Sequence, residues 1–171
     1  QAGNAVKGFQ GAVFEKAQQI KDNKAHKKEL EEARNRAITS SISSVSAEEF
    51  FRSFEANISD VNDLKTGYMA ISGCYVILTM KSNREKDLSE YKDAYVGCSD
   101  TVGFDVYSQL CGFGNVDVYA DFKFKQPMKI LLYPCDSDQL ESRYASLVQD
   151  FQSVSSYNKW EAMKSEQYSA Q

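Results

Sequence analysis

Four cysteines are the residues best suited to chemistry in this sequence: Cys74, Cys98, Cys111 and Cys135. A catalytic cysteine needs a nearby base, normally a histidine, to take the proton from its thiol. The only histidine, His26, lies in a strongly polar segment near the N-terminus, so we expect no Cys–His pair. A single histidine also excludes metal sites and proton relays that need several imidazoles.

The spacing of the cysteines, 24, 13 and 24 residues, is too wide for a compact zinc knuckle, and no CxxC is present. Four cysteines allow two disulfides in three connectivities, and they are equally consistent with reduced, half-buried thiols. Paired carboxylates occur, for example Asp117 with Asp121, but nothing in their spacing requires them to converge in a cleft. We therefore predict no catalytic residue and no metal ligand, and we expect a protein that is not an enzyme.

One cysteine is followed by a pattern of charged residues. Cys135 precedes Asp138 by three positions, and Arg143 follows on the next predicted helix. This pattern resembles the surroundings of bilin-bearing cysteines in phycobiliproteins, and Cys98 with Asp100 is a less complete match. The resemblance implies a thioether to the pigment, a carboxylate that holds the pyrrole nitrogens and a guanidinium that pairs with a propionate. These five residues are the candidates for a covalently bound bilin.

The whole chain is similar in character to the linker or γ-type subunits of red-algal phycobilisomes. Those subunits are rich in aromatic residues, have arms at both ends and sometimes carry bilins on cysteine. Aromatic residues make up 12% of this chain. The resemblance implies a photosynthetic light-harvesting linker protein, located in the chloroplast stroma or at the thylakoid surface.

The elements that must position these residues follow from the periodicity of the apolar side chains. Spacings of three and four residues predict a central core helix over 61–78, and strict alternation predicts a half-buried strand over 116–125. Ser46 and Glu49 form a capping-box pattern at the start of a short aromatic helix. The remaining predictions are helices over 88–98, 102–110 and 140–151, the last capped by Asp136 or Asp138, and a second strand over 128–133.

These elements predict an α+β, mainly helical fold with a small antiparallel β-hairpin near 116–133 packed on a helical core. We expect three parts: a helical arm and Ser-rich link over 1–45, a globular α+β domain over 46–152, and a polar tail over 153–171. Residues 1–36 carry eight basic and five acidic side chains, a net charge of +3, whereas the remainder carries 12 and 19, a net charge of −7. We therefore expect the arm to contact an acidic surface or the body of the domain.

Several aromatic residues lie in polar segments that offer no core of their own. Exposed aromatic side chains are typical anchors of protein–protein contacts, so we predict partner binding through Phe9, Phe14, Tyr157 and Trp160. The net charge of −4 disfavours nucleic acid as a partner. No apolar run approaches the roughly 18 residues that a membrane span requires.

The sequence thus favours a non-enzymatic scaffold or linker subunit that binds other protein subunits of a complex, with a phycobilisome component as its most specific form. The alternative is a secreted, disulfide-stabilised domain that binds a small molecule or a protein. The state of the cysteines, whether reduced, disulfide-bonded or pigment-bearing, distinguishes these interpretations.

Overall fold

The computed structural model describes residues 2–58, 62 and 64–163. The chain divides into two units, Gln1–Arg36 and Ala37–Gln171. The first unit is formed by most of a long helix, α1 (Ala2–Ser40), which ends in the second unit. The second unit holds the remaining described elements.

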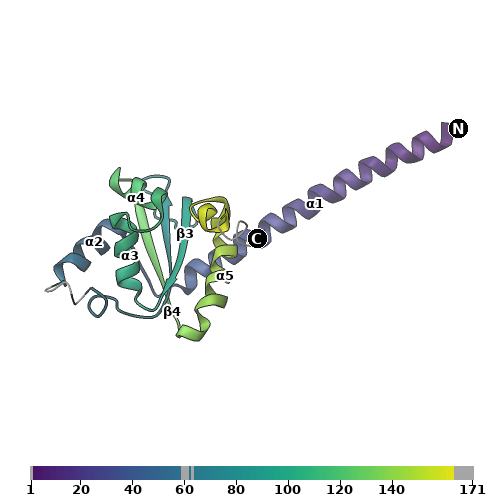
Figure 1. The fold of residues 1–171 in the computed structure, drawn as a ribbon. Coiled ribbons are helices and arrows are strands. Elements are labelled where there is room, and N and C mark those ends of the chain that lie inside the picture. The colour runs from purple at the N-terminus through teal and green to yellow at the C-terminus, as the bar shows by residue number, and fades with distance from the viewer. Residues whose placement is uncertain (1, 59–61, 63, 164–171) are drawn as a thin grey trace. The chain divides into compact units, whose positions relative to one another are not determined.

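A four-stranded antiparallel sheet forms the centre of the second unit (Figure 1). Its strands are β1 (Ser43–Ser46), β2 (Gly73–Met80), β3 (Tyr91–Ser99) and β4 (Met128–Pro134). They lie in the order β1-β4-β2-β3, so the two central strands are β4 and β2. All eight residues of β2 are buried, because helices cover both faces of the sheet.

Helices lie on both sides of this sheet (Figure 1). The first face is covered by α2 (Ala47–Ala56), α3 (Val102–Cys111) and α4 (Val116–Lys123). The second face is covered by α5 (Leu140–Phe151) and by the last turn of α1. Two short 3-10 turns, Ser137–Gln139 and Ser153–Ser155, lie on either side of α5.

The two faces are filled differently. The first is rich in rings: Phe54 stacks on Tyr107 with ring centroids 4.4 Å apart, and Tyr75 lies 6.1 Å from Tyr95. A carboxylate joins this core, since the Tyr75 hydroxyl donates a hydrogen bond to Asp105. Burial raises the pKa of Asp105 and of both tyrosines, with nearby carboxylates adding to the effect on the tyrosines.

The second face is mainly aliphatic. Its buried side chains include Val76, Leu78, Val96 and Leu131 from the sheet. One aromatic hydroxyl ties α1 to this face, because Tyr133 donates a 2.7 Å hydrogen bond to the backbone carbonyl of Ala37. The end of α1 is thereby part of the folded unit.

The outer edge of β3 is closed by the segment after α5. Asn158 accepts a 2.7 Å hydrogen bond from the backbone N–H of Val96 and donates one of 3.0 Å to its carbonyl. Two residues earlier on the strand, the backbone N–H of Ala94 donates a 3.0 Å hydrogen bond to the Ser156 hydroxyl. The Ala94 carbonyl accepts a 3.3 Å hydrogen bond from the backbone N–H of Tyr157. An open edge is a template for unwanted strand pairing, and this segment covers it.

The mainly helical α+β class is confirmed, with helices making up 55% of the structure. The capping box is confirmed in part, since Ser46 accepts a 3.1 Å hydrogen bond from the Glu49 backbone N–H. The predicted helices over 102–110 and 140–151 and the strand over 128–133 are also present. Neither Asp136 nor Asp138 makes a side-chain cap at the start of α5 or its preceding turn.

Three predicted elements are wrong. The predicted core helix over 61–78 is wrong, because residues 64–72 form turns and irregular structure and β2 follows from Gly73. The predicted helix over 88–98 is β3. The strand over 116–125 is helix α4, so the hairpin near 116–133 does not exist; β4 pairs with β1 and β2. Strands of a sheet covered on both faces carry continuous apolar runs, which imitate helical spacing.

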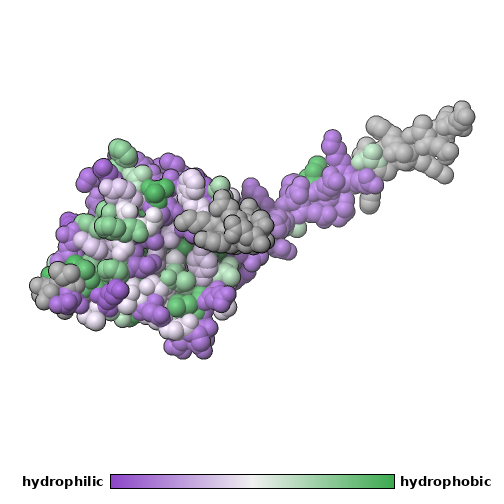
Figure 2. Space-filling view, in the orientation of Figure 1, coloured by the Kyte–Doolittle hydropathy of each residue, from purple (hydrophilic) through white to green (hydrophobic). Residues whose placement is uncertain are grey.

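The arm is helical, and the side chains of 15–29 are all exposed. Figure 2 shows that its described surface is almost entirely hydrophilic. A weak ion pair lies on its described surface, between Lys28 and Glu32 at 3.9 Å. Among the described residues, no helix is long and apolar enough to cross a membrane.

Candidate functional site

A surface pocket of about 560 Å³ lies on the first face, beside the edge of the sheet. Four parts of the chain form it: β3, the end of α3, the turn before α4 and the C-terminal segment. We call it the aromatic pocket, and it is lined by Tyr95, Gln109, Phe113, Gly114, Asn115, Val116, Trp160 and Glu161.

Two glycines shape the turn that places Phe113. Gly112 ends α3 with a φ of 94°, in the left-handed region that glycine adopts without strain. Gly114 lies against the side chain of Gln109, where a Cβ atom would overlap the amide group. The Gln109 Oε1 atom then accepts a 2.6 Å hydrogen bond from the backbone N–H of Asn115.

The polar groups beneath the turn are bonded to one another. Gln109 donates to the Tyr95 hydroxyl at 3.1 Å, and Asn115 donates to the Tyr157 carbonyl at 2.7 Å. The Asn115 Oδ1 atom caps α4 by accepting from the backbone N–H groups of Asp117 and Val118, both at 3.1 Å. These cap bonds occupy N–H groups that a helix start would otherwise offer to an anion.

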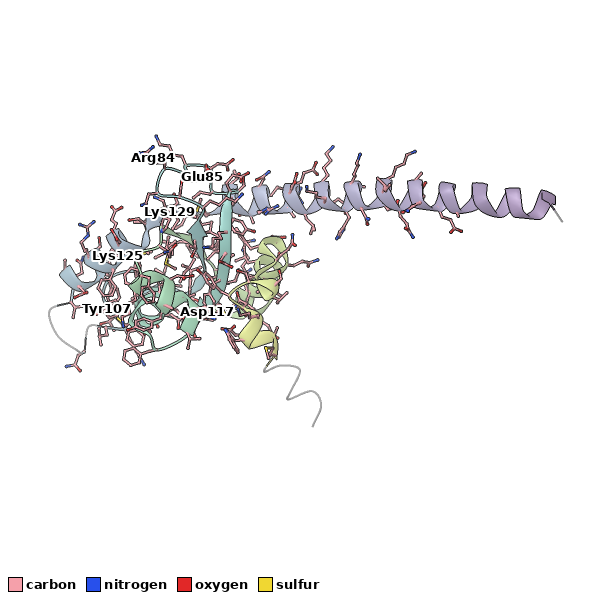
Figure 3. The ribbon with its side chains drawn as sticks, turned by 90° about the horizontal axis from the view of Figure 1, so that it is seen from above. Arg84, Glu85, Tyr107, Asp117, Lys125 and Lys129 are labelled. Atoms are coloured by element: carbon pink, nitrogen blue, oxygen red, sulfur yellow. The ribbon has the colours of Figure 1, made fainter. Side chains whose placement is uncertain are left out.

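Large apolar side chains surround the opening. Phe113 is 85% exposed, Val116 is 63% exposed and Trp160 is 43% exposed. The Trp160 Nε1 atom donates a 2.8 Å hydrogen bond to Asp117, and Lys159 lies 3.5 Å from the same carboxylate. The C-terminal segment is thus held against α4 on the side of the domain where Figure 3 labels Asp117.

Glu161 is the unusual residue of the aromatic pocket. Its Oε2 atom is buried and has no hydrogen-bond partner among the described residues. The carboxylate lies near two phenols: after burial, it is the main cause that raises the pKa of Tyr95 and of Tyr144. A buried carboxylate oxygen without a donor is costly, and a cationic or hydroxyl-bearing ligand would remove that cost.

A smaller cleft of about 180 Å³ lies at the start of α2, near the turn between β2 and β3. Lys125 and Lys129 line it together with Glu48 and Glu85. Figure 3 shows Lys125, Lys129 and Glu85 on this side of the domain. Two cations facing two carboxylates leave no net charge to select a ligand, so this cleft is the weaker candidate.

The residues predicted to hold a bilin lie in a third region, at the start of β2. Cys98 is the direct partner of Cys74 across the β2–β3 pair. Cys135 follows β4, and after burial it is the neighbour that raises the pKa of the Cys74 thiol most. The Cys74 thiol itself donates a 3.8 Å hydrogen bond to the Leu140 carbonyl. Asp100 accepts hydrogen bonds from the hydroxyls of Ser72 and Ser137. We call Cys74, Cys98 and Cys135 the thiol cluster.

The other two predicted bilin residues differ in their surroundings. The guanidinium of Arg143 lies 5.4 Å from the ring centre of Tyr133, and its charge acts on the Cys74 thiol. Asp138 lies in an exposed 3-10 turn. The fold therefore brings Cys98, Cys135 and Arg143 around Cys74, a residue that the sequence pattern did not single out. Bilin attachment stays a prediction.

The residues predicted to bind a partner differ in their exposure. Tyr157 is only 4% exposed and bonds Thr79 and Asp121, so the prediction of an exposed contact is wrong for this residue. Its hydroxyl finds partners inside the domain because the segment after α5 packs on the sheet instead of forming a loose tail. Trp160 is exposed, and its role in binding stays a prediction. The side chains of Phe9 and Phe14 lie outside the described residues.

Sequence patterns missed the aromatic pocket, because its residues come from positions 95 to 161 and meet only in the folded chain. One local signal was available: Asn115 directly before Val116 is a favourable N-cap, and recognising it would have predicted α4. Among the described residues, no group of three His, Cys, Asp or Glu side chains is arranged to hold a metal. No family model, curated protein or solved structure matches the chain.

Proposed function

We propose that this protein is a non-enzymatic scaffold or linker subunit, and that its aromatic pocket receives a cationic side chain of a partner protein. One observation carries the proposal: the unpartnered oxygen of Glu161 lies in a pocket rimmed by the exposed side chains of Phe113, Val116 and Trp160.

Exposed rings around a pocket are typical of protein-binding hot spots. Aromatic anchors supply most of the affinity at such sites, while surrounding polar groups exclude water. Trp160 is held in place by Asp117, so little conformational entropy is lost when a partner covers it.

The charge of the pocket favours a cation. One oxygen of the Glu161 carboxylate, Oε2, has no hydrogen-bond partner among the described residues, whereas the backbone N–H groups of Asp117 and Val118 are already bonded to Asn115. The face of an indole ring also attracts cations, as Lys159 over Trp160 at 5.6 Å demonstrates within this chain. Arginine and lysine combine an apolar stem with a charged end, which fits an apolar rim above a carboxylate.

The arm supplies a second contact in this proposal. Its net charge of +3 and its fully exposed side chains over 15–29 suit an acidic surface of another subunit. A helix that is polar on all sides gains little by burial in its own domain. A subunit with one cation-binding pocket and one basic arm can join two neighbours.

The fluorescence of Trp160, the only tryptophan in the chain, reports directly on the aromatic pocket. We propose titrating the full chain with N-acetyl-arginine amide and with the neutral analogue N-acetyl-citrulline amide. We expect arginine to bind at least about tenfold more tightly, since a charged hydrogen bond contributes about 1.5–3 kcal/mol.

The Glu161→Gln variant should lose this preference, and Glu141→Gln, an exposed carboxylate on α5, should keep it. Equal binding of the two probes by the unmodified chain would contradict the proposal. So would an unchanged preference in Glu161→Gln.

A light-harvesting linker is the most specific form of the proposal. It is supported by the resemblance around Cys135 and by the position of Cys98, Cys135 and Arg143 around Cys74. A visible absorption band and an added tetrapyrrole mass on one cysteine are expected for protein from its natural source, and their absence would remove the pigment from the proposal. The alternative, a disulfide-stabilised binding domain, would share the aromatic pocket but differ in the state of the thiols.

A further inference from the structure

The sheet register sets Cys74 on β2 directly opposite Cys98 on β3. The pairing of the two strands runs without a shift from Gly73 as far as Thr79, so the alignment of the two cysteines is fixed by their neighbours. Directly opposed residues of an antiparallel pair place their side chains on the same face of the sheet. Because Cys74 belongs to the core of the second face, the Cys98 side chain lies on that face too.

The hydrogen bonds along β3 show that the two cysteines share no backbone hydrogen bond. In an antiparallel strand, the N–H and C=O groups of one residue point to the same side, and the side alternates from residue to residue. Both backbone groups of Val96 point away from β2, because they bond to the side chain of Asn158. Cys98 lies two residues further along β3, so its backbone groups also point away from Cys74.

The hydrogen bonds on the other side of β2 agree with this orientation. The Ser72 carbonyl accepts a 3.2 Å hydrogen bond from the Cys135 backbone N–H, so it points toward β4. Cys74, two residues later, has the same orientation and is paired with Tyr133 on β4. Opposed residues that share no backbone hydrogen bond have Cα atoms about 4.5 Å apart and the closest side chains. A disulfide spans Cα distances of about 4.4–6.8 Å, so the opposed pair of cysteines lies within this range.

Neither of the other two cysteines is placed for a bond to Cys74. Cys135 lies two residues beyond Tyr133, the direct partner of Cys74 on β4, and is therefore a diagonal neighbour. Diagonal neighbours are about 7–8 Å apart, at or beyond the limit that a disulfide spans. Cys111 ends α3, a helix that covers the first face of the sheet. The fold therefore selects Cys98 as the partner of Cys74.

The two opposed thiols differ in accessibility. Cys98 is exposed on the outer strand β3, whereas Cys74 is buried, and its thiol donates a 3.8 Å hydrogen bond to the Leu140 carbonyl. Burial raises the pKa of both thiols, that of Cys74 to about 12, so the buried thiol is a poor starting nucleophile. A reagent in solution therefore meets Cys98 first. Rotation about the Cα–Cβ bond of Cys74 is enough to turn its sulfur from Leu140 toward Cys98.

We propose that Cys74 and Cys98 form an intramolecular disulfide when the reduced protein meets a low-molecular-weight disulfide such as oxidised glutathione. The thiolate of Cys98 attacks one sulfur of the small disulfide, whose S–S bond breaks and releases one glutathione thiolate, which takes a proton from solvent. The Cys74 thiol then gives its proton to solvent, and its sulfur attacks the Cys98 sulfur and releases the second glutathione. Two protein thiols are oxidised, and one small disulfide is reduced to two thiols. The product joins the edge strand β3 to the central strand β2 and consumes the exposed thiol of the thiol cluster.

The test uses the full chain, first reduced and then incubated with mixtures of oxidised and reduced glutathione until the number of free thiols is constant. The remaining thiols are alkylated, and intact mass and peptide mapping count and locate them. We expect two alkylated cysteines per chain, Cys111 and Cys135, and a cross-linked peptide that joins Cys74 to Cys98.

Two matched variants identify the pair, because each removes one thiol of the thiol cluster. Cys98→Ser should abolish the cross-link, and its exposed position tolerates a hydroxyl without loss of the fold. Cys135→Ser should retain the cross-link fully. A cross-link from Cys74 to any cysteine other than Cys98, a cross-link between two chains, or a chain that stops at the glutathione adduct of Cys98 would overturn the proposal. So would four alkylated cysteines at every glutathione ratio.

Discussion

The two faces of the four-stranded sheet are packed with different kinds of side chain. The first face packs rings and buried polar groups, and at its edge it opens into the aromatic pocket, where the Glu161 Oε2 atom has no hydrogen-bond partner among the described residues. The second face packs aliphatic side chains and collects three thiols at one end. Alternation along a strand sends neighbouring residues such as Cys74 and Tyr75 to opposite faces, so the two faces are packed with different side chains.

The largest expected difference between the faces concerns their rings. Phe54 contacts the rings of Phe50, Tyr68 and Tyr107, whereas Phe151 contacts only the ring of Tyr91 among the described aromatic pairs. We expect Phe54→Leu to lower the free energy of unfolding by about 2–4 kcal/mol and Phe151→Leu by about 1 kcal/mol. Urea unfolding of both variants measures this, and equal losses would show that the first face gains nothing from its ring contacts.

The next effect concerns the edge where the two faces meet. Asn158→Ala removes two hydrogen bonds that close the β3 edge at Val96. We expect a loss of about 1–3 kcal/mol, because the backbone groups of Val96 remain buried without a partner. Asn57→Ala is the control, since it removes one exposed hydrogen bond to Ser53 and should cost far less. Similar losses in the two variants would mean that the edge is not sealed by this segment.

Alkaline pH distinguishes the faces by a smaller effect. The folded pKa of Cys74 is raised from 9.0 to about 12, so its contribution to stability is complete below pH 9 and is lost as the pH rises toward 12. On the first face, burial also raises the pKa of the Cys111 thiol from 9.0, while the tyrosines begin to lose their contribution only above their ordinary pKa of 10.0. Cys74→Ala should therefore flatten the fall in the urea midpoint between pH 9 and 10. An unchanged slope would show that this thiol does not titrate differently in the folded chain.

The smallest effect is expected for the arm. Deleting residues 1–30 leaves Ala37, whose carbonyl accepts the Tyr133 hydrogen bond. The deletion removes the exposed side chains over 15–29 and the half-buried Leu30. We expect the free energy of unfolding to change by less than about 0.5 kcal/mol, while binding to an acidic partner weakens. A large loss of stability would show that the two faces do not suffice to stabilise the domain.

Local signals predicted several elements of both faces correctly. Ser46 caps α2, and the apolar stripe that ends in Leu147 and Phe151 forms the buried side of α5. These elements depend on contacts within one turn or on one covered face, which a short window of sequence contains.

The centre of the sheet was not predictable in this way. β2 is buried on both faces, so Tyr75 and Leu78 match a helical spacing although they point to opposite sides of a strand. The opposite error occurs at α4, a helix that was predicted as a strand. Its eight residues are too few to distinguish strand alternation from helical spacing when the Asn115 cap is overlooked. The candidate sites share this limit: Glu161 and Phe113 meet only after the C-terminal segment closes the β3 edge.

The central claim is that the aromatic pocket holds a cationic side chain, and intermolecular NOEs test it most directly. With the full chain and saturating N-acetyl-arginine amide, we predict NOEs from the arginine methylene protons to the rings of Trp160 and Phe113. They should vanish in Glu161→Gln and persist in Glu141→Gln. NOEs confined to other parts of the chain, or none at all at saturation, would contradict this account.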